Sequence, residues 1–262
     1  TSIFTCNNKS HADGKVDPAF SGYISAFTSG TISSKSTIRI LLTEESSTKH
    51  ELNTPVEEEL FDFDPDIKGK TVWIDNRTIE FRPENMMTPG QEYSATFYLG
   101  KVMEVHSNLS EFEFVFDVMK QDFEVYVDGI KTTDKQKMIW QRVFGTLATA
   151  DEADNNVIEK ILSAEQNGKK LKISWEHGAD INKHRFTVDS IRRGEKASSV
   201  VLKWNGKPLG VDVENSKTVE VPSLSDFKVM DMKVVQSPEQ YISIQFSDPL
   251  MESQLLDGLI HF

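Results

Sequence analysis

Apolar side chains alternate with polar ones along most of the chain, which is typical of strands that bury one face of a sheet. The clearest stretch runs from Thr71 to Leu99 and alternates on both sides of a turn. Pro83 ends the first run, and Pro89-Gly90 supplies the turn before the second. We predict scaffold strands here, with these buried positions: Trp73, Ile79, Phe81, Tyr93, Ala95, Phe97 and Leu99.

The same pattern predicts a first β-sandwich domain over residues 18–120, preceded by a polar tether over residues 1–17. Short alternating runs in this domain are separated by loop and turn residues. Its last strand, from Phe112 to Phe116, places aromatic side chains on one face, which we expect to be core. The apolar positions of its other strands include Ile38, Ile40, Leu42, Leu60, Phe61 and Phe63.

A second β-sandwich domain is predicted over residues 121–228. Asp128-Gly129 is expected to break its first strand, and Asn205-Gly206 has the composition of a tight hairpin turn. The predicted strands are Phe123–Val127, Met138–Leu147, Leu171–Trp175, Arg185–Ile191, Val200–Trp204 and Thr218–Val221.

One short helix is predicted inside the second domain. Residues 156–159 have the spacing of a capping box, with Asn156 in the place of Ser or Thr. Asn167-Gly168 is expected to end the helix. The apolar residues expected on its buried face are Val157, Ile158, Ile161 and Leu162. The fold class is therefore all-β, with two Ig-like sandwiches in series and one short helix.

Residues 229–262 repeat the start of the first domain. The matched positions are Ile242, Ile244 and Phe246 against Ile38, Ile40 and Leu42. Leu259–Phe262 matches Leu60–Phe63 at an interval five residues shorter. Internal repeats indicate a string of similar modules. A sandwich takes about 100 residues, so we expect residues 229–262 to be the first strands of a truncated third domain and the chain to be an N-terminal fragment.

Composition narrows the partners. The chain has 262 residues, of which 38% are hydrophobic, and a net charge of −12 from 41 acidic and 29 basic side chains. Nucleic-acid binding requires a basic stripe, but the basic clusters are only Lys169-Lys170 and Arg192-Arg193. We therefore expect no nucleic-acid partner. No apolar run approaches the roughly 20 residues of a spanning helix.

Cys6 is the single cysteine, so an intrachain disulfide and a Cys-rich zinc site are both excluded. The short segment Thr1–Thr5 before it and the polar run after it resemble the end of a bacterial lipoprotein signal. On this interpretation Cys6 becomes the first mature residue and carries lipid. The alternative is a disordered terminus with an incidental thiol.

Two acidic runs are candidates for chemistry. Asp62, Asp64 and Asp66 alternate, and oxygen-rich loops can bind calcium, but the glycine and glutamate of an EF-hand loop are missing. A turn between strands explains this run better. A second acidic run is expected to favour the start of the helix, because the helix dipole stabilises negative charge there: Asp151, Glu152 and Asp154.

His177 and His184 flank the Gly178 loop of a predicted hairpin, and a metal pair is possible there. No third ligand stands at a clear spacing, so a structural pair is the simpler interpretation. Trp175 and Trp204 are expected to be core, although an exposed aromatic platform could bind sugar. No nucleophile motif such as G-x-S-x-G is present.

The segment from Phe20 to Gly30, followed by Ile32-Ser33 and Ser36–Ile40, resembles the opening of bacterial alpha-2-macroglobulin-like proteins. Residues Ile242–Leu250 are similar to a strand and turn that recur in the next domain of that family. The resemblance implies macroglobulin-type sandwiches stacked in a large periplasmic lipoprotein that traps proteases. In that family a protease cuts a bait segment, the molecule rearranges, and in many members a thioester captures the attacker.

The working parts of that family have no match in this chain. A thioester needs a C-x-E-Q setting, whereas Cys6 is followed by Asn7-Asn8-Lys9. The resemblance therefore implies a non-catalytic, monomeric structural segment of a broad-spectrum protease inhibitor, without cofactor, metal or catalytic residues. It would meet proteases through downstream regions and the membrane through a lipid anchor, in the periplasm or cell envelope. An Ig-like cell-surface module that binds glycan or protein is the alternative, because many bacterial Ig-like domains share the I-x-I-x-F-S-x-P pattern. An accessory domain of an enzyme is the third possibility.

Overall fold

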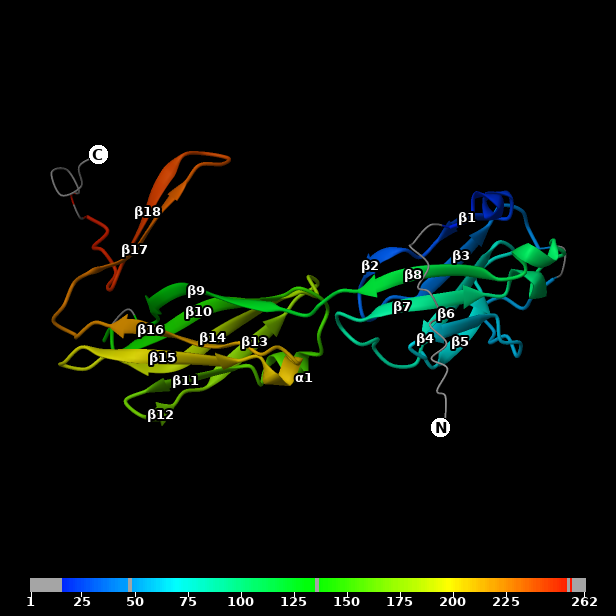
Figure 1. Ribbon diagram of the computed structural model, residues 1–262. Helices are drawn as coiled ribbons and strands as arrows, with labels where there is room; N and C mark the ends of the chain where they lie inside the picture. Colours follow the sequence, from blue (N-terminus) through cyan, green and yellow to red (C-terminus); the bar gives the residue numbers. More distant parts are fainter. Residues whose placement is uncertain (1–15, 47–48, 135–136, 254, 256–262) are drawn as a thin grey trace, which may run out of the picture. The chain divides into compact units, whose positions relative to one another are not determined.

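The computed structural model describes residues 16–46, 49–134, 137–253 and 255. The chain divides into two compact units, Thr1–Lys120 and Gln121–Phe262, and both are built almost wholly from strands (Figure 1). The predicted all-β fold of Ig-like sandwiches is confirmed. Within the described part of the chain, no helix has the length and apolar character needed to cross a membrane.

The first unit is a sandwich of two four-stranded sheets. One sheet has the order β1-β3-β6-β5, and the other has the order β2-β8-β7-β4. Neighbouring strands are antiparallel except for β2 and β8, which run parallel. The strands are β1 (Ile24–Phe27), β2 (Gly30–Ile32), β3 (Ile38–Leu42), β4 (Phe61–Asp64), β5 (Gly69–Trp73), β6 (Thr78–Pro83), β7 (Glu92–Phe97) and β8 (Phe112–Val118). Short 3-10 turns lie at Pro18–Gly22, Leu99–Lys101 and Ser107–Leu109.

The core of the first unit lies between its two sheets and is rich in phenylalanine. Ile38, Ile40 and Leu42 of β3 are fully buried, and the aromatic face of β8 packs in the same core. Phe112 makes an edge-to-face contact with Phe27 at a centroid distance of 5.0 Å. Each such side chain contributes about 1.5–3 kcal/mol through burial. The predicted buried positions of the Thr71–Leu99 stretch are confirmed.

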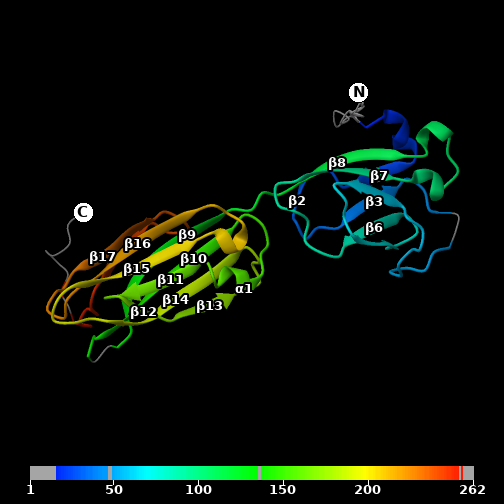
Figure 2. The same ribbon diagram turned by 60° about the horizontal axis from the view of Figure 1, so that its bottom comes forward.

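The second unit contains another pair of four-stranded sheets, ordered β13-β14-β10-β9 and β12-β11-β15-β16 (Figures 1 and 2). All of their strand pairs are antiparallel. The strands are β9 (Phe123–Thr132), β10 (Trp140–Thr149), β11 (Leu162–Gln166), β12 (Lys169–Lys170), β13 (Ile173–His177), β14 (Lys183–Arg192), β15 (Ser198–Asn205) and β16 (Glu214–Val221).

The predicted helix exists but is shorter than expected. Helix α1 spans Asn155–Ile158, and Asp154 stands at its N-cap position without a side-chain cap hydrogen bond. Leu162, predicted on the helical face, instead starts strand β11, and Asn167-Gly168 forms the turn to β12. The expectation of a capping box at Asn156 was wrong, because the N-cap position is Asp154 and Asn156 lies inside the helix. The helix ends early because the chain from Leu162 onward pairs with β15.

Two turn predictions in the second unit were also wrong. Strand β9 continues through Asp128-Gly129, because a register shift opposite Phe144 and Gly145 absorbs the irregularity. Asn205-Gly206 is not a two-residue hairpin turn, since a 3-10 turn at Lys207–Leu209 intervenes before β16. Asn and Gly at a strand end therefore marked the loop but not its length.

Beyond β16, strands β17 (Val229–Val235) and β18 (Tyr241–Phe246) form a separate two-stranded antiparallel sheet. Figure 1 shows this pair in orange and red after the yellow strands of the second sandwich. The matching strand Leu259–Phe262 predicted from the repeat lies outside the described residues. A two-stranded ribbon alone is marginally stable in water, so the β17–β18 pair depends on its contacts with the rest of the second unit.

Candidate functional site

Cys6, the predicted lipidation site, lies outside the described residues, as does most of the tether over residues 1–17. The structure therefore adds nothing to the lipid-anchor hypothesis, which stays a prediction.

The acidic run of the first unit belongs to strand β4 and the turn that follows it. Asp62 accepts a hydrogen bond at 3.0 Å from the backbone N–H of Phe63. Asp64 ends the strand and precedes a cis bond to Pro65. Across the described ranges, no group of three or more His, Cys, Asp or Glu side chains is placed to hold a metal ion.

The acidic run of the second unit lies before α1. Asp154 occupies the N-cap position of α1 but makes no side-chain cap hydrogen bond, and the first turn of the helix holds no acidic residue. Asp151 is buried, and its backbone N–H and C=O bond the side-chain amide of Gln121 at 3.0 and 3.2 Å. These bonds fasten the first residue of the unit to the segment that carries α1.

His177 and His184 are brought together as predicted, because they are cross-strand partners on β13 and β14. Their Nδ1 atoms lie 2.9 Å apart, and His177 Nε2 lies 3.1 Å from Glu159 Oε1. His184 is buried, and its Nε2 atom has no hydrogen-bond partner among the described residues. Burial and the neighbouring His177 lower the pKa of His184 below its ordinary value. Sequence spacing identified the pair but not Glu159.

The tryptophans are placed largely as expected. Trp175 and Trp204 are partly buried and pack against the core of the second unit. Trp140 is different, because it is 45% exposed and lines a pocket of about 310 Å³. Arg142 and Asp189 lie in the same pocket and form an ion pair at 2.5 Å. Ser190 beside them has a left-handed backbone with φ 62° at a bulge in the β10–β14 pairing.

A serine and a histidine also meet in the first unit. Ser46 Oγ lies 3.0 Å from His50 Nε2, and the His50 ring stacks on Trp73 at a centroid distance of 3.9 Å. Burial lowers the pKa of His50. Among the residues described, no carboxylate bonds the other ring nitrogen, so the orienting member of a catalytic triad is missing there.

Arg193, predicted only as one member of the basic pair Arg192-Arg193, is a buried group that donates hydrogen bonds to five other residues. Its side chain is 0% exposed and directly follows β14. It forms a two-pronged ion pair with Asp248, which lies just after β18. Its remaining hydrogen bonds go to backbone carbonyls: Pro222 at 3.2 Å, Ser223 at 2.6 Å, Asp226 at 3.2 Å and Met138 at 3.5 Å.

We call the set formed by Arg193, Asp248 and these carbonyls the arginine junction. Burial opposes ionisation of Asp248, but hydrogen bonds from Arg193 and Ser247 outweigh it and lower the pKa of the carboxyl. A planar guanidinium with five donors suits such a site, because a lysine could not satisfy this many acceptors. The junction joins the end of β14, the β16–β17 connection and the end of β18.

Further bonds attach the strand pair to the same sandwich. Thr132 Oγ1 donates to the carbonyl of Ser247 at 2.7 Å, and the Gln245 amide donates to the carbonyl of Ile130. Each of these two bonds joins residues that are 115 positions apart in the sequence. The β17–β18 pair is therefore held to the second sandwich by side-chain hydrogen bonds rather than by a shared sheet.

The held strand pair has one polar face and one apolar face. Cross-strand register places Met232 opposite Ile244 and Val234 opposite Ile242. Met232 is 65% exposed and Val234 is 68% exposed. The opposite face carries Asp231, Lys233, Ser243 and Gln245. Contiguous exposed apolar side chains of this kind mark sites of contact with another protein, a membrane or a ligand.

Comparisons with known proteins add little. No family model matches the chain. No curated protein matches it. A solved structure titled "Anomalous substructure of Titin-A168169" is similar over 76% of this chain and 96% of its own, with 6% identity and a TM-score of 0.27. A likeness at that TM-score supports no inference about what this chain does.

Proposed function

We propose that this chain is a non-catalytic structural segment of a bacterial alpha-2-macroglobulin-like, broad-spectrum protease inhibitor. Its role is to hold successive β-sandwich modules together in a large envelope protein, anchored to the membrane through Cys6. The macroglobulin resemblance of Phe20–Gly30 and Ile242–Leu250 supports the family.

The arginine junction is the observation that carries the structural role. An isolated strand pair would gain little stability, yet a fully buried guanidinium and two further hydrogen bonds fix β17–β18 to the second sandwich. Burying a charge is costly unless its partners satisfy it. A fully buried guanidinium with its donors engaged favours fixing the next module over chemistry.

The bare apolar face of β17–β18 supports the same role. Met232, Val234 and Ile242 lie on one face of the β17–β18 pair. In the repeat, Ile242 matches Ile38 of β3, which is buried. We infer that these strands begin a third sandwich, whose other sheet covers this face.

Protease challenge of the polypeptide encoded by the whole gene tests the proposal. A protease trap retains the enzyme after one bait cleavage, so the captured protease still cleaves a small chromogenic peptide but no longer cleaves casein. A catalytically dead protease, which cannot cut the bait, is the matched control and should stay free. If the protease still cleaved casein after incubation, and gel filtration showed no protease retained by the protein, the inhibitor role would be excluded.

A second candidate, an Ig-like surface module that binds glycan, is favoured by the pocket at Trp140. An exposed indole beside the Arg142–Asp189 ion pair offers a stacking surface and planar polar groups. Calorimetric titration with a panel of oligosaccharides tests it: binding that Trp140→Ala abolishes would support this function. Binding that the substitution leaves unchanged would remove the pocket from consideration.

A further inference from the structure

We propose that Glu159, His177 and His184 form an acid-sensitive latch, which holds the α1 segment against strand β13 and releases it in mildly acidic solution. The α1 segment is defined as residues 151–161. This regulatory device is independent of whether the protein is a protease inhibitor.

The hydrogen-bond chain of the latch dictates where its protons lie. Glu159 is an acceptor when ionised, so His177 Nε2 carries the hydrogen of their 3.1 Å contact. His177 Nδ1 then presents a lone pair, and His184 Nδ1 must donate across the 2.9 Å contact. His184 Nε2 is left without hydrogen, and the two neutral rings adopt opposite tautomers.

An added proton has no good position in this chain. If His184 binds it, a buried imidazolium forms whose Nε2–H lacks an acceptor among the described residues. If His177 becomes the cation, two N–H groups would face each other at 2.9 Å unless His184 moves its hydrogen to Nε2. Both routes place a hydrogen on the same buried, unpartnered nitrogen, which costs free energy.

The surroundings of the latch are already short of hydrogen bonds. Thr149 Oγ1 and Asn182 Oδ1 are buried and also lack partners in the described part of the chain. The backbone N–H of Thr149 bonds the carbonyl of Asn182 at 3.0 Å, beside the register pair of Leu147 and His184. Among the described residues, three unmatched buried polar atoms therefore lie at one end of this sheet, and opening to water would supply them with hydrogen bonds.

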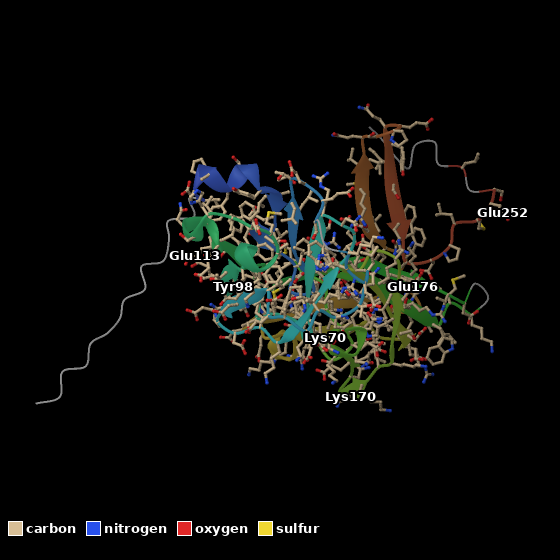
Figure 3. The ribbon with its side chains drawn as sticks, turned by 90° about the vertical axis from the view of Figure 1, so that its right-hand side faces the viewer. Lys70, Tyr98, Glu113, Lys170, Glu176 and Glu252 are labelled. Atoms are coloured by element: carbon tan, nitrogen blue, oxygen red, sulfur yellow. The ribbon has the colours of Figure 1, made fainter. Side chains whose placement is uncertain are left out.

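Few other charges can compensate the added proton. Strand β10 contributes Leu147 opposite His184 and no charge. Asp180 in the β13–β14 turn favours protonation of His184, but Lys183 pairs with it at 3.0 Å. Glu176, labelled in Figure 3, neighbours His177 on β13 and lies 3.9 Å from Arg185 of β14. Glu159 is the carboxylate bonded to the pair, and its bond goes to His177.

Release of the latch would act on the segment that fastens the start of the unit. Ile158 and Ile161 of the α1 segment are buried against Phe123 and Leu147. Gln121, the first residue of the unit, is bonded to Asp151 at the other end of the segment. Protonation therefore links solution pH to the order of the residues at the start of this sandwich.

The sign of the pH dependence follows from proton counting. In the open form His184 binds a proton near the ordinary histidine pKa of 6.5, whereas in the closed form burial and His177 lower the pKa of His184. Between these two values the open form holds more protons, so falling pH favours opening. One linked proton changes the opening equilibrium about tenfold per pH unit within that window.

Hydrogen exchange of the full chain, in EDTA to remove metal ions, provides the test. The backbone amides of residues 158–161 should lose protection about tenfold per pH unit below the ordinary histidine pKa, relative to those of β3. His184→Asn keeps a donor for His177 and does not titrate, so its protection ratio should stay flat. His106→Gln removes an exposed histidine of the first unit and should behave as wild type.

A flat ratio in the wild type, or an unchanged slope in His184→Asn, would overturn the latch. Nitrogen-15 spectra of the wild-type imidazoles give a second test that needs no variant. They should report Nε2–H for His177 and Nδ1–H for His184 at neutral pH, with His184 titrating where protection is lost. Identical tautomers, or titration of His184 without loss of protection, would refute the proposal.

Discussion

Strand pairs β1–β3 and β17–β18 share an alternating pattern but differ in what covers them. On β3, Ile38 and Ile40 are 0% exposed beneath the facing sheet of the first sandwich. On β18, the matching Ile242 is 39% exposed, and its neighbours on β17 are more exposed still. The first pair contributes to a core that lies between two sheets. The second pair is held by the arginine junction, and its apolar face is exposed to solvent.

This difference teaches that alternation reports which face of a strand is apolar, not whether that face is covered. Stability in β3 comes from burial of aliphatic and aromatic side chains between two layers. Stability in β17–β18 comes from polar contacts at one end of the pair. Substitutions should therefore affect the two regions through different chemistry.

The largest effect is expected from Arg193→Met. Loss of the guanidinium leaves Asp248 and several carbonyls without their donor, which should cost about 3–5 kcal/mol of the local stability of β17–β18. Limited proteolysis between residues 224 and 240 measures it, with cleavage rising more than about a hundredfold, since each 1.4 kcal/mol is a factor of ten. Arg192→Met is the matched control, because Arg192 is exposed and should change cleavage little. Equal effects of the two substitutions would contradict the junction.

The comparison itself is tested by a matched pair of isoleucines. Ile38→Ala should destabilise the first sandwich by about 2–5 kcal/mol, because it opens a cavity in a closed core. Ile242→Ala should change stability by no more than about 0.5 kcal/mol, as for a surface site. Urea unfolding followed by circular dichroism compares them. A comparable loss in both variants would mean that the β18 face is already buried.

A smaller effect is expected from acid at Asp248. Because the folded pKa of this carboxyl lies below its ordinary value of 3.8, its contribution is complete above that value. The contribution is lost as pH falls through the lowered pKa. Proteolysis by an acid-active protease should release β17–β18 over that interval in wild type, whereas Asp248→Asn should show no such step. An identical step in the variant would assign the acid sensitivity elsewhere.

Periodicity identified many of the strands and much of the core, since period-two alternation marked Phe112, Phe114 and Phe116 as buried. It also placed His177 opposite His184 through their hairpin. The helix was overextended because Ile161 and Leu162 suit a helical face and a strand equally well, and pairing with β15 decided between them.

The arginine junction could not be predicted in the same way. Arg193 and Asp248 are 55 positions apart, and no local pattern distinguishes a buried arginine from its exposed neighbour Arg192. Glu159 was likewise missed, because its bond to His177 spans 18 positions and depends on where α1 ends. Contacts between charged side chains that are distant in sequence depend on tertiary packing, and no periodic pattern in a single sequence predicts them.

Oxidation of methionine by hydroxyl radicals tests whether a further layer covers the apolar face of β17–β18. Met232 is 65% exposed on the bare face, and Met87 is 3% exposed in the first core, which makes it an internal reference. In the 262-residue chain, Met232 should be oxidised much faster than Met87. In the polypeptide encoded by the whole gene, we predict that Met232 becomes as protected as Met87, because the proposed third sandwich would cover it. Unchanged rapid oxidation of Met232 in that longer protein would contradict the account.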